Sequence, residues 1–157
     1  MAFDYDYAGN LSLLDRPTVA FFASRVVPPG LYDRALRWAE ECCATDRVVI
    51  SGFHSPLEKA VFRLLLEAHH PVIWALGRSL YRHYPPEVQA AFAEERILVF
   101  AVRNGRRTGF RTAQTRNVAV ASLSDESVYA IDGAGSGSSL GVVCGLEPGT
   151  KRVTLLS

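Results

Sequence analysis

The sequence predicts an α/β domain that is doubly wound, with a mainly parallel sheet of about six strands and helices on both faces. Short, continuous runs of apolar residues recur along the chain and are typical of strands buried on both faces of a parallel sheet. Between these runs, apolar residues return every few positions, which indicates helices with one buried face. Because strands and helices alternate regularly, we expect right-handed crossovers.

The strands are predicted from apolar runs that contain few polar residues. Thr-Val-Ala-Phe-Phe-Ala, which starts at Thr18, and Val-Val-Ile, which starts at Val48, are clear examples. Such runs suit strands that have no solvent-facing side. In chain order, we expect strands at residues 18–23, 47–51, 71–76, 96–102, 127–131 and 152–156.

The helices are predicted from amphipathic spacing and from prolines that suit a first helical turn. Leu31, Ala35 and Cys42 fall on one helical face. Pro56 and Pro86 stand in the first turns of predicted helices, where the missing N–H group of proline costs no hydrogen bond. In chain order, we expect helices at residues 31–42, 56–68, 85–92 and 112–124.

One Rossmann-like domain accounts for almost the whole chain. With 157 residues the protein can bury a sizeable core but has no room for a second full domain. We expect the domain to span residues 17–157. Residues 1–16 alternate tyrosines, acids and small polar residues without a clean period, so we expect an N-terminal arm that packs by its aromatic side chains.

The composition is that of an ordinary globular protein, with 48% hydrophobic and 21% charged residues. A formal net charge of +1 argues against a uniformly cationic nucleic-acid-binding protein. Arginines nevertheless gather in one stretch, where they could bind phosphate in bidentate fashion or could form a solvated, salt-bridged loop. These arginines are Arg103, Arg106, Arg107, Arg111 and Arg116.

Metals, cofactors and membranes are not expected as partners. The cysteines Cys42, Cys43 and Cys144 are odd in number, and no CxxC or HxxxH spacing occurs, so we predict no disulfide framework, no structural metal and no cofactor. The chain begins with acidic and aromatic residues and has no apolar stretch of roughly 18 residues. We therefore expect a cytoplasmic location and no membrane partner.

Polar and glycine-containing segments follow the predicted strands, at the edge where open parallel sheets bind ligands. Glycine lets the main chain approach an oxyanion, N–H groups at a helix start point towards it, and serine adds short hydrogen bonds. This mixture predicts a phosphate-binding edge. From the loops, the candidate phosphate-binding residues are Ser24, Arg25, Ser51, Gly52, His54, Gly77, Gly133, Gly135, Ser136, Gly137 and Ser138.

Spacing alone assigns no catalytic residue. The sequence has no GxxxxGK[ST] motif and no GxGxxG after the first strand, which argues against a P-loop ATPase and a nicotinamide dehydrogenase. His54, Glu58 and Asp132 could form an acid–base set for a hydrolytic or glycosidic reaction. The same residues are better explained as a surface histidine, a carboxylate in a first helical turn and an aspartate that orders a turn.

Several short motifs are informative through their order along the chain. They are VVISGF at 48–53, PVIWALG at 71–77, YPP at 84–86, TRN at 115–117, LSD at 123–125 and GSGS at 135–138. In this order they resemble the Rossmann-like core of the DNA-processing protein A (Smf) family, over most of residues 17–156. In that family one strand ends in SG, and another ends in G and is followed by YP. An RNR motif then leads into a helix that ends in LSD, and an SGS turn follows the next strand.

The resemblance implies a binding protein. Full-length members of the family bind single-stranded DNA and help to load recombinase during natural transformation, and the wider superfamily includes nucleotide sensors and nucleoside-phosphate hydrolases. We therefore expect a phosphate-ligand binding domain, for a nucleotide or single-stranded DNA, rather than an enzyme. The residues that carry over from the family motifs are Arg25, Ser51, Gly52, Arg116, Asn117 and Ser136 to Ser138.

Departures from the family leave two alternatives open. Ala23-Ser24 stands where the family has a glycine-serine pair, and Val118 replaces the last arginine of RNR. One alternative is a nucleoside-monophosphate phosphoribohydrolase-like hydrolase, although the glutamate of its PGGxGTxxE signature has no counterpart before Glu147. The other is a non-catalytic interaction module that forms a homodimer.

Overall fold

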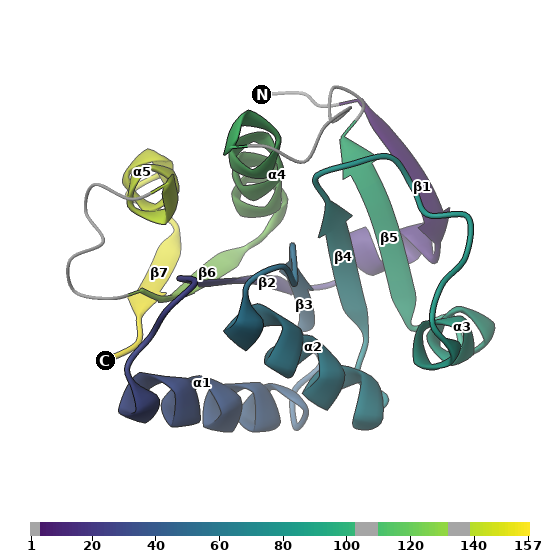
Figure 1. Ribbon diagram of the computed structural model, residues 1–157, viewed down its shortest axis with the longest axis horizontal. Helices are drawn as coiled ribbons and strands as arrows, with labels where there is room; N and C mark the ends of the chain where they lie inside the picture. Colours follow the sequence, from purple (N-terminus) through teal and green to yellow (C-terminus); the bar gives the residue numbers. More distant parts are fainter. Residues whose placement is uncertain (1–3, 103–109, 132–138) are drawn as a thin grey trace.

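A seven-stranded sheet forms the centre of the computed structural model, which describes residues 4–102, 110–131 and 139–157. Its strands are β1 (Tyr5–Gly9), β2 (Thr18–Ala23), β3 (Val48–Ser51), β4 (Val72–Leu76), β5 (Ile97–Val102), β6 (Glu126–Ala130) and β7 (Arg152–Leu155). They are arranged in the order β1-β5-β4-β3-β2-β6-β7 (Figure 1). β1 is antiparallel to β5, and the other pairings of this sheet are parallel. The predicted mainly parallel sheet is confirmed.

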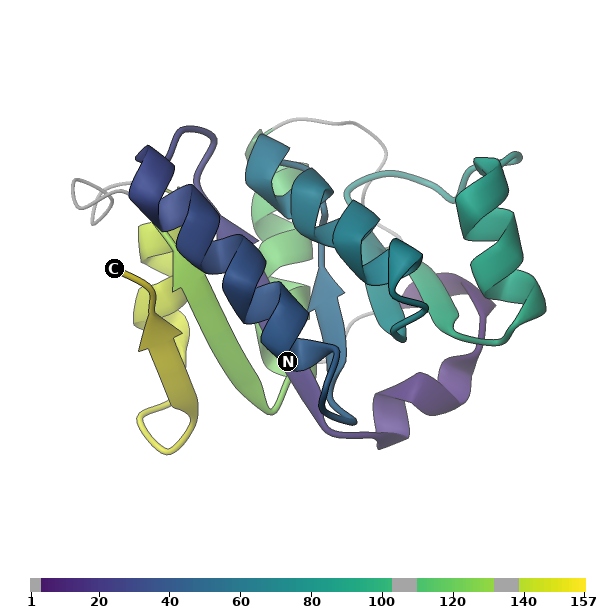
Figure 2. The same ribbon diagram turned by 90° about the horizontal axis from the view of Figure 1, so that it is seen from below.

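Helices cover both faces of the sheet, as the sequence predicted. The helices are α1 (Pro29–Cys42), α2 (Pro56–Glu67), α3 (Pro86–Ala93), α4 (Phe110–Leu123) and α5 (Ser139–Leu146). Figure 2 shows α1, α2 and α3 on one side of the sheet, and α4 and α5 lie on the other side. Each side has its own buried cluster of apolar residues, so the α/β class and the double winding are confirmed.

The local sequence explains the elements that matter most here. All residues of β2 and β5 are buried, which accounts for their unbroken apolar runs. Prolines stand in the first turns of α1, α2 and α3. α2 also begins with a capping box, in which the Ser55 hydroxyl accepts the N–H of Glu58 and the Glu58 carboxylate accepts the N–H of Ser55.

The N-terminal segment contributes a strand that the sequence pattern did not indicate. β1 pairs with β5 from Tyr5 opposite Val102 to Gly9 opposite Leu98. The Tyr5 ring meets the Phe100 ring edge-to-face, with 5.0 Å between the centroids. After a short 3-10 helix at Leu11–Asp15, the chain enters β2. Residues 5–9 therefore complete the sheet at the open side of β5.

The strand order reverses between β2 and β6. β2, β3, β4 and β5 follow one another outward in one direction, and β6 returns to the other side of β2. The N–H of Ser24 donates to the carbonyl of Ala130 at 3.0 Å, so the carboxyl ends of β2 and β6 lie together. In open α/β sheets, ligands bind outside the carboxyl ends at such a reversal. The loops that follow β2, β3 and β4 share this edge.

A substitution at Gly9 tests how β1 is attached to the rest of the sheet. Its φ of +100° is unfavourable for other residues, and an added Cβ would meet the Ile97 carbonyl oxygen. We expect Gly9→Ala to lower the free energy of unfolding by about 2 kcal/mol or more, measured by urea denaturation. Gly30→Ala is the control, because a Cβ at position 30 meets nothing within 4 Å and helix α1 favours alanine. Equal stability of the two variants would contradict this account.

Candidate functional site

Charge is unevenly distributed between the two ends of the strands. The loops that follow β2, β3 and β4 contain arginines but no Asp or Glu. Their arginines are Arg25, Arg78 and Arg82. At the amino ends of the strands, by contrast, acids and bases occur together and pair, as Arg47 does with Glu126, Arg96 with Glu94 and Lys151 with Glu147. A formal net charge of +1 therefore conceals a basic carboxyl edge, which favours the approach of an anion.

A cavity of about 220 Å³ opens at the carboxyl ends of β3 and β4. Four of the residues predicted from the sequence line it together, namely Gly52, His54, Gly77 and Arg116. They come from the loop after β3, the loop after β4 and helix α4. Elements far apart in the sequence thus meet at one hollow of the basic edge.

The turn after β3 exposes main chain to this cavity. Ser51 is buried, and its hydroxyl accepts the N–H of Phe53 at 3.1 Å, so it stabilises the turn rather than facing the hollow. Phe53 has a φ of 45°, in the left-handed region, which is uncommon for an aromatic residue. Its ring stacks on Phe62 with 4.3 Å between centroids, and this packing holds the strained conformation.

Arg116 lies directly against Gly52. A Cβ added to Gly52 would be 2.5 Å from Nε of Arg116, so the glycine makes room for the guanidinium. The Nε–H of Arg116 donates to Oδ1 of Asn117 at 3.3 Å, and both side chains are buried. Asn117 therefore orients Arg116 rather than lining the cavity itself. Burial lowers the pKa of Arg116, while the nearby Glu58 carboxylate opposes this shift.

Glu58 fixes the carboxyl ends of two strands. One carboxylate oxygen accepts the N–H of Ala23 at 2.9 Å, and the other accepts those of His54 at 2.9 Å and Ser55 at 3.3 Å. Burial raises the pKa of Glu58, against the effect of these hydrogen bonds and of Arg116. With both oxygens engaged and the side chain only 4% exposed, Glu58 is a structural carboxylate and does not face the cavity.

The pKa of His54 reflects the positive electrostatic potential at this edge. Partial burial of its ring and the charges of Arg116, Lys59 and Arg25 lower its pKa below the ordinary 6.5, although the residue as a whole is exposed. The imidazole is therefore neutral at neutral pH. Three cations act on one exposed side chain, which indicates that the cavity mouth is short of negative charge.

The remaining predicted residues are placed differently. Ser24 and Arg25 follow β2 at the strand reversal and do not line the cavity, although the charge of Arg25 acts on His54. The glycine-serine turn lies outside the described residues; it comprises Gly133, Gly135, Ser136, Gly137 and Ser138. Arg103, Arg106 and Arg107 also lie outside them.

Sequence reasoning missed the charged and aromatic residues among the others that line the cavity, which are Phe53, Lys59, Trp74, Arg78 and Tyr81. Lys59 is on the first turn of α2, and Trp74 belongs to β4. The signal for Arg78 and Tyr81 was the interleaving of cationic and aromatic residues between Arg78 and Tyr84. The cavity is thus more aromatic than the glycine and serine pattern suggested.

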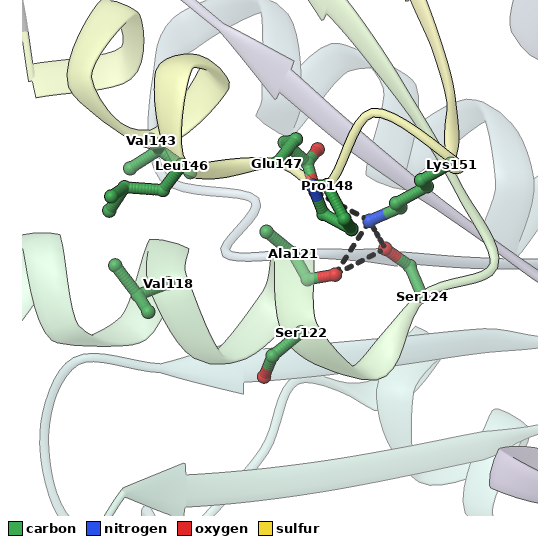
Figure 3. Close-up of a pocket in the computed structure, with 9 residues that line it drawn as sticks. All are labelled: Val118, Ala121, Ser122, Ser124, Val143, Leu146, Glu147, Pro148 and Lys151. Atoms are coloured by element: carbon green, nitrogen blue, oxygen red, sulfur yellow. Dashed lines mark hydrogen bonds and ion pairs between the residues drawn. The ribbon is translucent and has the colours of Figure 1, made fainter. Parts of the chain in front are cut away.

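A second cavity, of about 320 Å³, lies between α4 and α5 (Figure 3). The Lys151 ammonium within it donates to the Ala121 carbonyl, the Ser124 hydroxyl and Glu147 Oε1, at 2.6, 2.9 and 2.7 Å. Tyr129 donates to the other Glu147 oxygen at 3.1 Å. Lys151 has no N–H left for a ligand. This cavity is larger, but its charges neutralise one another, and we assign the site to the first cavity.

Two further observations bear on partners. Within residues 4–102, 110–131 and 139–157, no three His, Cys, Asp or Glu side chains gather as a metal site requires. No helix of the described chain has both the length and the apolar character needed to cross a membrane. The cytoplasmic location and the homodimer stay predictions.

The fold and the site together define a Rossmann-like α/β domain with a basic, aromatic cavity at its carboxyl edge. The family model described as DNA recombination-mediator protein A matches residues 5–156. The chain therefore belongs to this family, and the resemblance drawn from its ordered motifs is confirmed. A search of curated proteins found no match.

Solved structures share the fold. DNA processing protein A from Helicobacter pylori, for which a single-stranded DNA binding mode is described, has a TM-score of 0.73 and 19% identity over 96% of this chain and 70% of its own. The Streptococcus pneumoniae protein has a TM-score of 0.70 and 20% identity over 96% of this chain. This chain spans about half of that protein, 54%. A molybdenum cofactor binding protein from Rippkaea orientalis has a TM-score of 0.60 and 15% identity, over 89% of this chain and 76% of its own.

Glu58→Gln tests the structural carboxylate. An amide must place an N–H group against a main-chain N–H, so we expect a loss of roughly 1–3 kcal/mol in the free energy of unfolding. Glu67→Gln, at the exposed end of the same helix, is the control and should change stability little. Equal loss in both variants would contradict the role given to Glu58.

The same variant has a characteristic pH dependence. Because the pKa of Glu58 is raised in the folded protein, the folded state binds more protons than the unfolded state between the ordinary 4.5 and the raised pKa. Wild-type stability should therefore fall as pH rises through this window, and Glu58→Gln should lack this contribution. Urea denaturation at a series of pH values measures both slopes.

Proposed function

We propose that this domain binds single-stranded nucleic acid through its phosphates at the carboxyl edge of the sheet, without cleaving it. The observation that carries the proposal is the buried guanidinium of Arg116, packed on Gly52 at a cavity with no acidic lining residue. Membership of the recombination-mediator family supports it, as does the single-stranded DNA binding mode described for the H. pylori protein.

The chemistry of the edge suits phosphate. Gly52 brings main chain to the surface of the cavity without a side chain, and Arg116 presents a planar donor beside it. Lys59 adds a second positive charge from the first turn of α2. Because Arg116 is partly desolvated and Lys59 lies nearby, a bound anion relieves repulsion between cations.

The positions of the cations favour a nucleic-acid strand over a single nucleotide as the ligand. Arg25 follows β2 and Arg82 follows β4, so basic side chains extend beyond both sides of the cavity. A mononucleotide can engage only the groups close to one phosphate cluster. A polynucleotide can engage all of them, and its binding then weakens steeply with salt.

A hydrolytic function has less support from the geometry. Of the carboxylates in the predicted acid–base set, Glu58 accepts main-chain N–H groups with both oxygens, and Asp132 lies outside the described residues. Glu147 is paired with Lys151 in the second cavity, away from the basic edge. Neither Glu58 nor Glu147 lines the cavity that holds Arg116.

Arginine substitutions test phosphate binding. Arg116→Ala and Arg25→Ala should each weaken binding of a fluorescent single-stranded oligonucleotide roughly tenfold, because each removes a charged hydrogen-bond donor. Each should also reduce the slope of log affinity against log salt by about 1. Fluorescence anisotropy over a salt series measures both quantities.

Arg152→Ala is the matched control for these variants. The Arg152 side chain is 79% exposed and belongs to β7, at the opposite end of the strands. It should leave affinity and slope unchanged. Arg25 is exposed, so its variant tests the proposal even where Arg116→Ala loses stability. An unaltered salt slope in Arg25→Ala and Arg116→Ala would contradict phosphate binding at this edge.

His54 should link binding to pH. A phosphate near the imidazole favours its charged form, so binding should raise the lowered pKa of His54 and take up a proton. Affinity should therefore increase as pH falls from the pKa of His54 in the complex to its lower pKa in the free protein, and should level off below that. NMR titration of His54 with and without oligonucleotide measures the shift. His70, whose ring contacts the Arg47 carbonyl at the amino ends of the strands, is the internal reference, and the oligonucleotide should leave its titration unchanged.

A further inference from the structure

The second cavity, between α4 and α5, combines apolar walls with a polar base (Figure 3). Of the described residues that line it, Glu147 and Lys151 are the charged ones, and they form an ion pair at 2.7 Å. Their side chains are 3% and 8% exposed, so this pair is shielded from solvent. Phosphate binding at the basic edge makes no use of this cavity. Its apolar lining comes from α4, α5 and the segment between α5 and β7, and comprises Val118, Ala121, Val143, Leu146 and Pro148.

The polar base is satisfied without any ligand. Lys151 donates its three N–H groups to acceptors within the protein. The hydroxyls of Ser122 and Ser124 donate to main-chain carbonyls of α4, at 2.9 and 3.1 Å. The described lining therefore has no side-chain donor left for an anion. Both oxygens of the buried Glu147 carboxylate already accept hydrogen bonds, so a cation would lose its hydration and gain little.

The base also fixes the walls of the second cavity in place. Through its contacts with Ala121 and Ser124, Lys151 joins the carboxyl-terminal end of α4 to the segment between α5 and β7. The buried Tyr129 of β6 donates to Glu147 and so holds this segment to the sheet. A preformed cavity of this kind binds a ligand without the cost of ordering its walls.

The volume of the second cavity suits a small molecule. It measures about 320 Å³, at the lower end of the range of roughly 300–1,000 Å³ that is typical of ligand pockets. An apolar cavity of about 150 Å³ is sufficient to bind benzene. The second cavity therefore has room for a compound with one or two rings.

We propose that the second cavity binds an uncharged, mainly apolar small molecule of one or two rings, held between α4 and α5. The walls supply the favourable free energy, because the ligand and the side chains of Val118, Val143 and Leu146 leave water together. The satisfied ion pair at the base sets the selectivity, since it offers a charged compound no new hydrogen bond. This site is separate from the basic edge and does not depend on the proposed function.

Three naphthalene compounds of similar size test the selectivity for an uncharged ligand. Naphthalenemethanol is uncharged, naphthoate is an anion and naphthylmethylammonium is a cation. NMR of protein with isotope-labelled Val and Leu methyl groups reports directly on the walls. We expect naphthalenemethanol to shift the methyl signals of Val118, Val143 and Leu146 saturably, with a dissociation constant of roughly 0.05–1 mM. The two charged compounds should bind there more weakly, by a factor of roughly ten or more.

Ala121→Phe localises the binding. Ala121 lines the second cavity, so the added ring fills it, while the main-chain carbonyl that accepts from Lys151 is kept. This variant should weaken naphthalenemethanol binding by a factor of roughly ten or more. Ala90→Phe is the matched control, because Ala90 is exposed on α3, and should leave binding unchanged. Leu146 is 66% exposed, so Leu146→Ser is compatible with folding and should weaken binding roughly threefold to tenfold through the loss of apolar wall.

The results separate a small-molecule site from other occupants of the second cavity. The lack of a saturable shift with naphthalenemethanol, or equal affinity for the three compounds, overturns the site for an uncharged ligand. Binding that is unchanged in both Ala121→Phe and Leu146→Ser places the compound elsewhere and overturns it as well. If the wall methyl signals shift with protein concentration alone, a second copy of the chain fills the cavity, and the small-molecule assignment is wrong. None of these results affects phosphate binding at the basic edge.

Discussion

The carboxylate of Glu58 ties together the parts of the carboxyl edge. It accepts main-chain N–H groups from the end of β2 and from the loop after β3, groups that would otherwise be buried without partners. The same side chain starts helix α2 through its capping box with Ser55. Its negative charge also acts on Arg116. The turn that carries Gly52 is therefore set by one buried side chain, and the position of the cavity depends on it.

Around this carboxylate the protein keeps more positive than negative charge. Arg116 is buried, three cations act on His54, and the loops after β2, β3 and β4 contain no Asp or Glu to neutralise them. Such an arrangement reduces stability through repulsion and prepares the surface for an anion. In the second cavity the charges are balanced, because the Lys151 ammonium forms an ion pair with the Glu147 carboxylate. This difference in charge, not the difference in volume, is why we assign the proposed site to the first cavity.

The sequence predicted those features that follow from local pattern and topology. β2 and β5 are buried on both faces, so their apolar runs were unmistakable, whereas β1 is short and contains an acid and a glycine. Gly141 and Gly145 similarly obscure α5. The loops that carry Gly52 and His54 were found because parallel strands place them at one edge. The position of Trp74 at the cavity and the hydrogen bond from the Ala23 N–H to the Glu58 carboxylate were not predicted. Both depend on side-chain directions and on packing between distant segments.

The strand that completes the sheet has a consequence for how the chain assembles. β5 is six apolar residues long, and without β1 it would be a sheet edge with unpaired N–H and C=O groups, which is the kind of segment that recruits other chains. β1 covers this edge, but Tyr5 and Val102 are so distant in sequence that their pairing closes a very long loop. We therefore expect the N-terminal strand to dock late in folding. Until β1 has docked, the unpaired edge of β5 can pair with other chains and aggregate. Residues 5–9 protect the folded sheet from this pairing.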